Sequence, residues 1–157
     1  TRSYSSAASD VYKRQLVHSE TVPSTFVPTR PFRVNAGSPH AYVMMADGNT
    51  RYMAELTAGD ELLAVDQEGN GRSVVLGRLK IEQRPMLKIV GKKHTKTHQN
   101  ANTCHVFMQQ AETVRLITGD STAVSVTALE KGQPVLGWEG HAARHVGRPV
   151  KGGVEER

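Results

Sequence analysis

Ionisable side chains are concentrated in LVHSETVPSTFVPTRPFRVNAGSPHAY, residues 16–42, a stretch without a helical period. They comprise two imidazoles, a carboxylate, two guanidiniums and an amide: His18, His40, Glu20, Arg30, Arg33 and Asn35. An arginine fork matches a carboxylate or phosphate with two parallel hydrogen bonds. Histidine carries protons near neutral pH, and glutamate can orient a histidine or act as a base. This set indicates an acid–base site with an anion anchor.

The spacing of these residues is compatible with such a site. Side chains alternate along an extended chain, so His18 and Glu20 would share one face, and Arg33 and Asn35 would also share a face. The Ala36-Gly37 pair that follows allows a ligand to approach the backbone closely. The alternative interpretation is a solvated edge strand with ordinary surface charges.

Prolines and turn signals predict the elements that position these side chains. Four prolines restrict the residues before them to extended backbone, so residues 16–40 are expected to form an extended connecting segment. Downstream, short β-like runs alternate with turns of the Asp47-Gly48-Asn49 type. Strands are expected at 41–45, 61–66, 72–82, 86–90, 104–109, 113–118, 123–126 and 135–138, with 51–56 a short strand or turn. The pattern predicts a mainly β fold, a small β-barrel or sandwich of short antiparallel strands over residues 41–140, followed by a C-terminal tail at 141–157.

Two stretches of the β region resemble each other. AELTAGDELLAVDQEG (54–69) and TALEKGQPVLGWEG (127–140) share a leucine, a glycine three residues later, an apolar pair and a closing Glu-Gly. Each predicts a tight turn that leads into a strand and then a hairpin loop. Two related halves, or a coincidence of common turn chemistry, would produce this pattern.

The first fifteen residues, TRSYSSAASDVYKRQ, are Ser/Ala-rich and aperiodic. Their last six letters resemble one reading frame of a transposon end. We interpret residues 1–15 as an artefact or a disordered tail, and leave them out of the fold prediction.

Composition argues against several functional classes. The net charge is +5, but aromatic residues do not alternate with the basic clusters, so nucleic-acid binding is not expected. No run is long enough to span a bilayer, so no membrane partner is expected. The one cysteine, Cys104, cannot form an internal disulfide, which suits a reducing compartment.

Metal and dinucleotide motifs are weak. The residue types of a zinc site are present as His94, His98, Cys104 and His105, but the last two are adjacent on an expected strand and would point to opposite faces, so no metal is predicted. Gly69-Asn70-Gly71 lacks a third glycine and a following helix, so a hairpin loop is expected there. Cofactor-binding residues stay unassigned.

Several stretches together carry a family resemblance. In order, LVHSETV, TRPFRVNAG followed by PHAYV, GNTRYMAELTAGDELLAVDQEGN, VVLGRLKIEQRPML, QQAETVRL and ARHVG resemble the C-terminal part of 3-dehydroquinate synthase of the second, archaeal type. The resemblance covers most of residues 16–147. Its most specific piece is RPFRVNAG followed closely by HAY.

The resemblance implies an NAD-dependent enzyme of aromatic amino-acid biosynthesis. The family converts 2-amino-3,7-dideoxy-D-threo-hept-6-ulosonate to 3-dehydroquinate by oxidative deamination and intramolecular aldol cyclisation. From this chemistry we predict Arg30 or Arg33 as carboxylate anchor, His18 or His40 as proton carrier, and Glu20 and Asn35 as orienting groups.

Family members also have an α/β N-terminal portion that is missing here, so this fragment alone is expected to be inactive. The resemblance implies a cytoplasmic location, or a plastid in a eukaryote. A homo-oligomer is left open, with the β domain pairing subunits. The competing interpretation is a non-catalytic β-barrel binding or interaction module.

Overall fold

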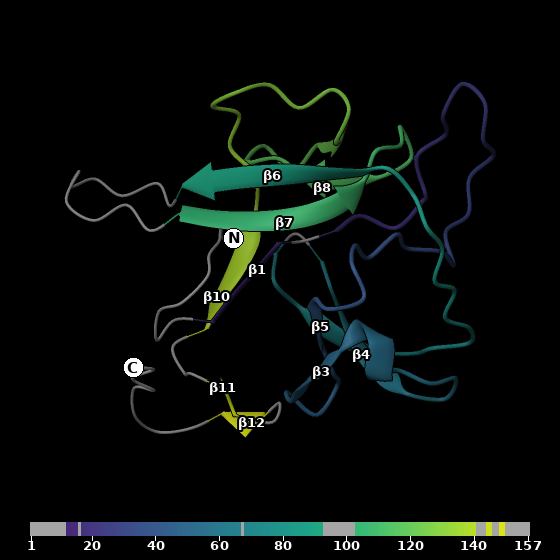
Figure 1. Ribbon diagram of the computed structural model, residues 1–157, viewed down its shortest axis with the longest axis vertical. Coiled ribbons are helices and arrows are strands. Elements are labelled where there is room, and N and C mark those ends of the chain that lie inside the picture. The colour runs from purple at the N-terminus through teal and green to yellow at the C-terminus, as the bar shows by residue number, and fades with distance from the viewer. Residues whose placement is uncertain are drawn as a thin grey trace.

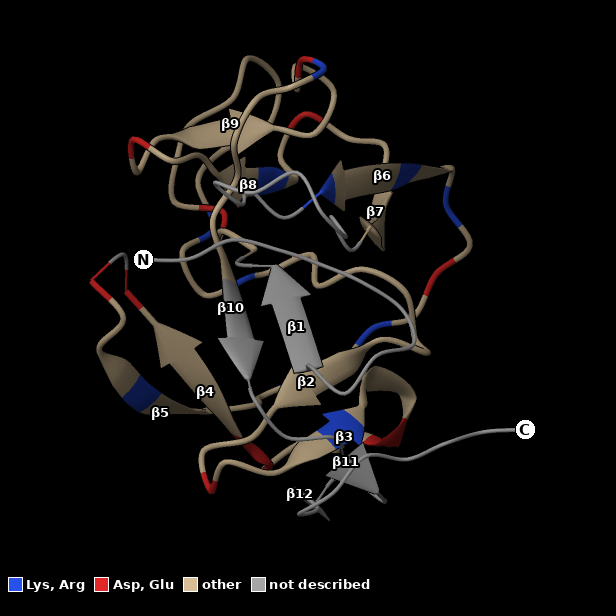
Figure 2. Ribbon diagram, turned by 90° about the vertical axis from the view of Figure 1, so that its left-hand side faces the viewer, with Lys and Arg blue, Asp and Glu red and all other residues tan. Residues whose placement is uncertain are grey.

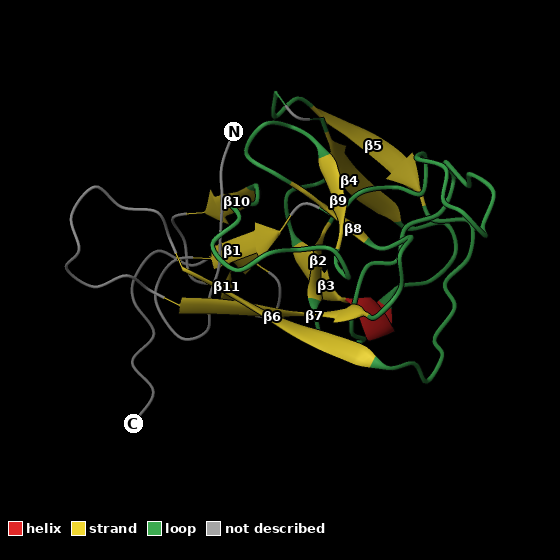
Figure 3. Cartoon of the chain, turned by 90° about the horizontal axis from the view of Figure 1, so that it is seen from above, coloured by secondary structure: helices red, strands yellow, loops and turns green. Residues whose placement is uncertain are grey.

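The computed structural model describes residues 12–15, 17–66, 68–92, 103–140, 144–145 and 148–149. Their elements are β1 (Tyr12–Gln15), β2 (Tyr42–Met44), β3 (Thr50–Tyr52), the 3-10 turn η1 (Met53–Glu55), β4 (Glu61–Val65), β5 (Gly71–Val75), β6 (Met86–Lys92), β7 (Thr103–Gln109), β8 (Arg115–Ile117), β9 (Ala123–Ser125), β10 (Gly137–Gly140), β11 (Arg144–His145) and β12 (Arg148–Pro149). Within these ranges η1 is the only helical element, coloured red in Figure 3. The mainly β prediction is confirmed.

The strands pair antiparallel, two at a time. Five pairs join consecutive strands, namely β2–β3, β4–β5, β6–β7, β8–β9 and β11–β12, and the sixth pairs β1 with β10. Isolated bridges connect some pairs, such as Met45 with Leu62 and Thr118 with Val135. In the described part of the chain, no continuous ladder joins the six pairs into a closed barrel.

The structure bears out the two related halves. Strands β2 and β3 and the Met45–Leu62 bridge recur at a constant spacing as β8, β9 and the Thr118–Val135 bridge. The backbone hydrogen bonds recur with them: Met45 N–H to Asn49 O, Ala46 N–H to Glu61 O and Met53 N–H to Ala41 O match Thr118 N–H to Thr122 O, Gly119 N–H to Pro134 O and Val126 N–H to Val114 O. Even the left-handed turn residue recurs, as Gly48 with φ 82° and Ser121 with φ 67°.

Each half has its own small core. One core consists of Met45, Met53 and Leu56, and the other of Met108, Val114, Leu116 and Val126. Figures 1 and 2 show the corresponding arrangement, with β3, β4 and β5 in the lower part of both views and β6, β7 and β8 in the upper part. The extended segment that carries the predicted site runs from the upper half to the lower one.

One predicted strand is wrong over half its length. Residues 72–82 alternate in sequence, but β5 ends at Val75 and residues 76–85 have no strand. Leu76 still bonds the turn before β4, through Gly59 N–H and Asp60 O. Leu76 and Leu79 pack on the lower core while the residues between them are exposed. The sequence alternation therefore reflects burial of single side chains and not a ladder.

The remaining boundaries lie within two residues of those predicted. Strand β6 extends to Lys92 and β7 begins at Thr103, so the connection between the two strands is shorter at both ends than the predicted strands at 86–90 and 104–109 imply. Its central residues, 93–102, lie outside the described residues. The division of the chain at residues 15, 40 and 140 stays a prediction.

Candidate active site

The segment that carries the predicted site, residues 17–40, begins as an extra strand on β8. Val17 bridges Leu116, and the N–H of His18 donates to the carbonyl of Arg115 at 3.0 Å. The side chain of Leu116 is fully buried, so this first contact fixes the segment to the upper core. The backbone of His18 is therefore fixed against β8, next to the upper core.

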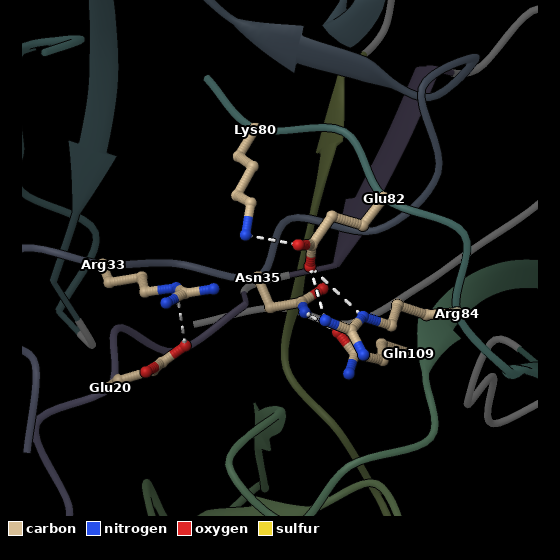
Figure 4. Close-up of polar contacts among 7 residues, drawn as sticks. All are labelled: Glu20, Arg33, Asn35, Lys80, Glu82, Arg84 and Gln109. Atoms are coloured by element: carbon tan, nitrogen blue, oxygen red, sulfur yellow. Dashed lines mark hydrogen bonds and ion pairs between the residues drawn. The ribbon is translucent and has the colours of Figure 1, made fainter. Parts of the chain in front are cut away.

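Glu20 closes a loop that runs to Arg33. Its N–H donates to the Arg33 carbonyl at 2.9 Å, and its own carbonyl accepts the N–H of Arg30 at 2.6 Å. The Glu20 side chain is buried, and its Oε1 lies 3.6 Å from the Nε of Arg33, as Figure 4 shows. A carboxylate this well covered requires a positive partner or hydrogen bonds to stay charged. The structure thus pairs Glu20 with Arg33.

Arg30 is the freer of the two predicted anchors. Its side chain is half-buried, and no described residue forms an ion pair or a side-chain hydrogen bond with its guanidinium. Only its backbone takes part in closing the loop. An arginine whose backbone is fixed and whose guanidinium has no partner among the described residues can bind an anion through two parallel hydrogen bonds.

Asn35 and Gly37 hold the next part of the segment across β7. The Asn35 amide Nδ2 donates to Gln109 Oε1 at 2.5 Å, a contact drawn in Figure 4. Gly37 has φ 103°, and a Cβ there would lie 2.7 Å from the carbonyl oxygen of Phe107. The Asn-Ala-Gly sequence, predicted to bring backbone near a ligand, here brings backbone against a strand. Asn35 thus has a structural contact, and its predicted role toward substrate stays a prediction.

Arg115 is a residue of this site that the sequence analysis missed. Its side chain is 7% exposed, and its guanidinium donates to the carbonyls of Val22 at 3.2 Å and Pro23 at 3.5 Å. It reaches these carbonyls from β8 across more than ninety positions of sequence. The available signal was one charged residue inside the apolar run VRLI. In the first half of the repeat, Tyr42 holds the corresponding position on β2.

The imidazole of His18 is poised to be neutral. Its Nε2 lies 3.3 Å from Thr21 Oγ1, and its buried Nδ1 has no partner in the described structure. Burial, and after it the positive charge of Arg115, lowers the pKa of His18 below its ordinary 6.5, while the neighbouring backbone of Ser19 acts the other way. A histidine held neutral in this way can accept a proton at neutral pH.

The titration of His18 tests this arrangement. We expect the His18 imidazole to titrate below 6.5 and, in Arg115→Met, to move back toward 6.5, because a nearby positive charge is lost. Proton NMR of the ring resonances measures both values, and Arg78→Met, which removes an exposed arginine elsewhere, serves as control. A His18 pKa at or above 6.5, or one unchanged in Arg115→Met, would contradict the geometry.

The lowered pKa of His18 also determines how the free energy of unfolding changes with pH. As pH falls below about 6.5 the unfolded chain takes up a proton at His18 before the folded chain does. The contribution of neutral His18 is therefore present above pH 6.5 and is lost as pH falls through its lowered folded-state pKa. His18→Gln should make the chain's unfolding free energy less sensitive to pH in this window.

His40 is not brought to the other predicted residues. Its Nε2 lies 3.4 Å from Ser38 Oγ, and its ring meets Phe107 edge-on with centroids 6.1 Å apart. With Pro39, Tyr52, Ala54 and Glu55 it lines a different, open hollow of about 400 Å³. No described contact links it to Glu20 or His18. Of the two proton carriers proposed, His18 is the one that lies near an arginine, Arg115, and close in sequence to Glu20.

A second charged cluster, also missed, lies on the strand-free segment before β6. Lys80 and Arg84 both pair with Glu82, the latter at 2.8 Å, and together they lower the pKa of Glu82 to about 2. The segment returns to β7 where the carbonyl of Pro85 accepts the N–H of Gln110 at 2.9 Å, next to the residue that binds Asn35. Figure 4 shows this cluster in the same close-up as Asn35 and Arg33. The signal for it was the alternation Lys-x-Glu-x-Arg.

Metal and cofactor sites have little support in the described residues. No group of histidine, cysteine and acidic side chains there could hold a metal ion; His94 and His98 lie outside this part. Cys104 is buried and His105 is exposed, on opposite faces of β7 as predicted. Gly69-Asn70-Gly71 spans the end of the β4–β5 hairpin loop, with no helix after it, so these residues do not fit a dinucleotide phosphate cradle. None of the described residues form a helix of the length and apolar character that crossing a bilayer requires.

Comparisons with known proteins identify relatives. A family described as "3-dehydroquinate synthase II C-terminal domain" matches residues 7–157. The chain is 44% identical over 142 residues to a "3-dehydroquinate synthase homolog" of Persephonella marina, covering 90% of this chain and 41% of that protein. It is 42% identical over 142 residues to a "3-dehydroquinate synthase" of Methanoregula boonei, again over 90% of this chain and 42% of the relative. It thus spans about two fifths of the length of these curated relatives. No solved structure gave a significant match.

Proposed function

The chain belongs to the 3-dehydroquinate synthase II family, through the C-terminal domain of that family, and from this premise we propose that it forms part of an enzyme that makes 3-dehydroquinate. The substrate would be 2-amino-3,7-dideoxy-D-threo-hept-6-ulosonate, converted by oxidative deamination and intramolecular aldol closure. NAD⁺ would supply the hydride acceptor when bound. The described residues do not offer its phosphate cradle, so the steps below concern this chain's own side chains.

One observation carries the proposal. Three predicted site residues lie on one short loop, in which Glu20 is buried against Arg33 and the guanidinium of Arg30 has no partner among the described residues, and His18 lies just before this loop. Side chains on a solvated edge strand would not bury a carboxylate or leave the Nδ1 of His18 covered without a partner. An anion anchor and a neutral base on the same segment are the two groups that a substrate with both a carboxylate and an amine requires.

The roles follow from this geometry. Arg30 would hold the substrate carboxylate in a bidentate pair. Glu20 would fix Arg33 through its Nε, leaving the outer nitrogens of Arg33 to support the same anion. His18 would accept a proton close to the amine-bearing carbon and return it during aldol closure. His40 would act elsewhere, at its own hollow.

A hybrid enzyme tests the proposal. Residues 16–157 would be joined to the preceding portion of the Methanoregula boonei relative, and NADH formation followed with the amino-sugar acid. Arg30→Gln is expected to raise KM about 10- to 100-fold with a smaller effect on kcat, because a charge-assisted pair of about 1.5–3 kcal/mol is lost in substrate binding.

Arg78→Gln is the matched control, since Arg78 is an exposed arginine outside the loop. Normal kinetics in Arg30→Ala, Arg33→Ala together would refute the anchor assignment. Turnover of the isolated 157-residue chain would refute the proposal that this domain is only part of the enzyme.

The non-catalytic module remains the competing proposal. Such a module would use the basic stretch 88–98 to contact an acidic partner, and residues 93–98 of that stretch lie outside the described residues. Binding of such a module to an acidic partner should weaken steeply with salt, whereas KM for a small substrate held in a covered site should depend on salt less.

A further inference from the structure

The loop closed by Glu20 and Arg33 presents two phenylalanines to solvent. Phe26 is 86% exposed and Phe32 is 88% exposed, the largest exposed fractions among the large hydrophobic side chains described. Val22 and Val34 at the ends of the loop are also exposed, at 39% and 48%. In Figure 1 this loop, coloured dark blue-violet, projects from the right-hand side of the molecule. Clustered exposed apolar side chains of this size mark an interaction site more often than isolated ones do.

The loop is nonetheless well ordered by its contacts. Arg115 binds the carbonyls of Val22 and Pro23, and the side chain of Ser24 both accepts from Val27 N–H and donates to Val27 O, each at 3.1 Å. The Glu20–Arg30 bridge closes its base. A loop fixed in this way loses little conformational entropy when a partner covers it. These contacts therefore hold the loop in a conformation that leaves both phenylalanines exposed.

The charge of the loop indicates the chemistry of the partner. Between Val22 and Val34 the only charged residues are Arg30 and Arg33, and Arg33 forms an ion pair with Glu20. Because Arg30 is assigned to the substrate carboxylate, the surface of the partner that covers the two phenylalanines would be apolar and would carry no charge of its own against them.

We propose that this Phe26–Phe32 loop docks onto the portion of the family protein that precedes this domain, in an apolar hollow that receives the two phenylalanine side chains. The relatives are more than twice as long as the region they share with this chain, so most of each relative lies outside the match. The inference rests on the proposed function, because docking would place the open Arg30 at the boundary between the two portions, where a shared substrate would be bound. The substrate anchor and the docking side chains would then be one structural unit.

Cysteine labelling tests the docking without needing activity. Phe26→Cys, Phe32→Cys and, as matched control, Val75→Cys place single thiols at exposed apolar positions; Val75 is 68% exposed on β5, and the native Cys104 is buried. The maleimide labelling rate of each site, read by peptide mass spectrometry, is compared between the 157-residue chain and the hybrid enzyme. We expect labelling at positions 26 and 32 to be at least about tenfold slower in the hybrid, and labelling at position 75 to be unchanged.

The outcomes separate the two proposals. Protection at 26 and 32 in an inactive hybrid supports docking and counts against the function, whereas full labelling in an active hybrid overturns docking alone. If labelling at positions 26 and 32 of the 157-residue chain becomes slower as the concentration of that chain increases, the loop docks onto a second copy of the chain, and the proposal is overturned. If the hybrid does not fold, grafting residues 21–34 with the same cysteines into the complete Methanoregula relative gives the same readout.

Discussion

Replacing Gly37 with alanine is expected to lower the free energy of unfolding by about 2–5 kcal/mol, through backbone strain of about 1–2 kcal/mol and overpacking of about 1–3 kcal/mol. Gly37 has φ 103°, a region that side chains with a Cβ rarely adopt. The added Cβ would also lie 2.7 Å from the carbonyl oxygen of Phe107 and 3.4 Å from Met108 Sδ. The carbonyl cannot move aside easily, because Phe107 is paired with Lys88 in the β6–β7 ladder.

Gly59 offers a matched control. Its φ of 98° is nearly the same, but nothing lies within 4 Å of its Cβ position. Gly59→Ala should therefore cost only the strain, about 1–2 kcal/mol. Urea unfolding followed by circular dichroism measures both. Equal losses in the two variants would show that the segment does not pack on β7 as described.

Turn chemistry made the β region predictable from sequence. Asp47-Gly48-Asn49 and Thr57-Ala58-Gly59-Asp60 form turns where the sequence predicts them, with left-handed φ at both glycines. The second turn recurs at residues 130–133, where the side chain of Gln133 accepts from the Glu130 N–H as Asp60 does from Thr57. Local hydrogen bonding of this kind depends on a few adjacent residues, so a short pattern suffices to find it.

Long-range pairing was not predictable in the same way. The alternation at residues 72–82 contained no information on whether a partner strand would lie beside it, and beyond Leu76 the structure shows none in the described residues. The role of Arg115 could not be predicted for the same reason, because its hydrogen-bond partners, the carbonyls of Val22 and Pro23, lie far away in sequence.

The candidate site was predicted as a set of residues, but its internal pairing was not. Residue types pointed to an acid–base group with an anion anchor on residues 18–40. They could not tell that Glu20 would meet Arg33, because that contact depends on how the loop between them closes. They also could not tell that His40 would turn toward Phe107 and away from His18. The roles of these residues toward substrate stay predictions until the hybrid enzyme is assayed.

Leu116→Ala is expected to lower the free energy of unfolding by about 2–5 kcal/mol, because it opens a cavity in a core that can relax only partly. The Leu116 side chain is 0% exposed and packs with Met108, Val114 and Val126. It also bridges Val17, the residue that leads into the candidate site. Loss of this side chain should therefore loosen the strand that carries His18, and NMR of the His18 ring in the same variant would show its pKa moving back toward 6.5 as the ring becomes hydrated.

The internal repeat supplies the control for this prediction. Val43 holds the corresponding position on β2 but is only half-buried, so Val43→Ala should cost about 1 kcal/mol, roughly the partial burial of two methyl groups. It should also leave the His18 resonances where they are, because Val43 packs on the lower core. If Val43→Ala cost as much as Leu116→Ala, or shifted His18 equally, the two halves would share one cooperative core. The segment that carries the site would then depend on the whole domain, and not on the upper half that holds its first strand.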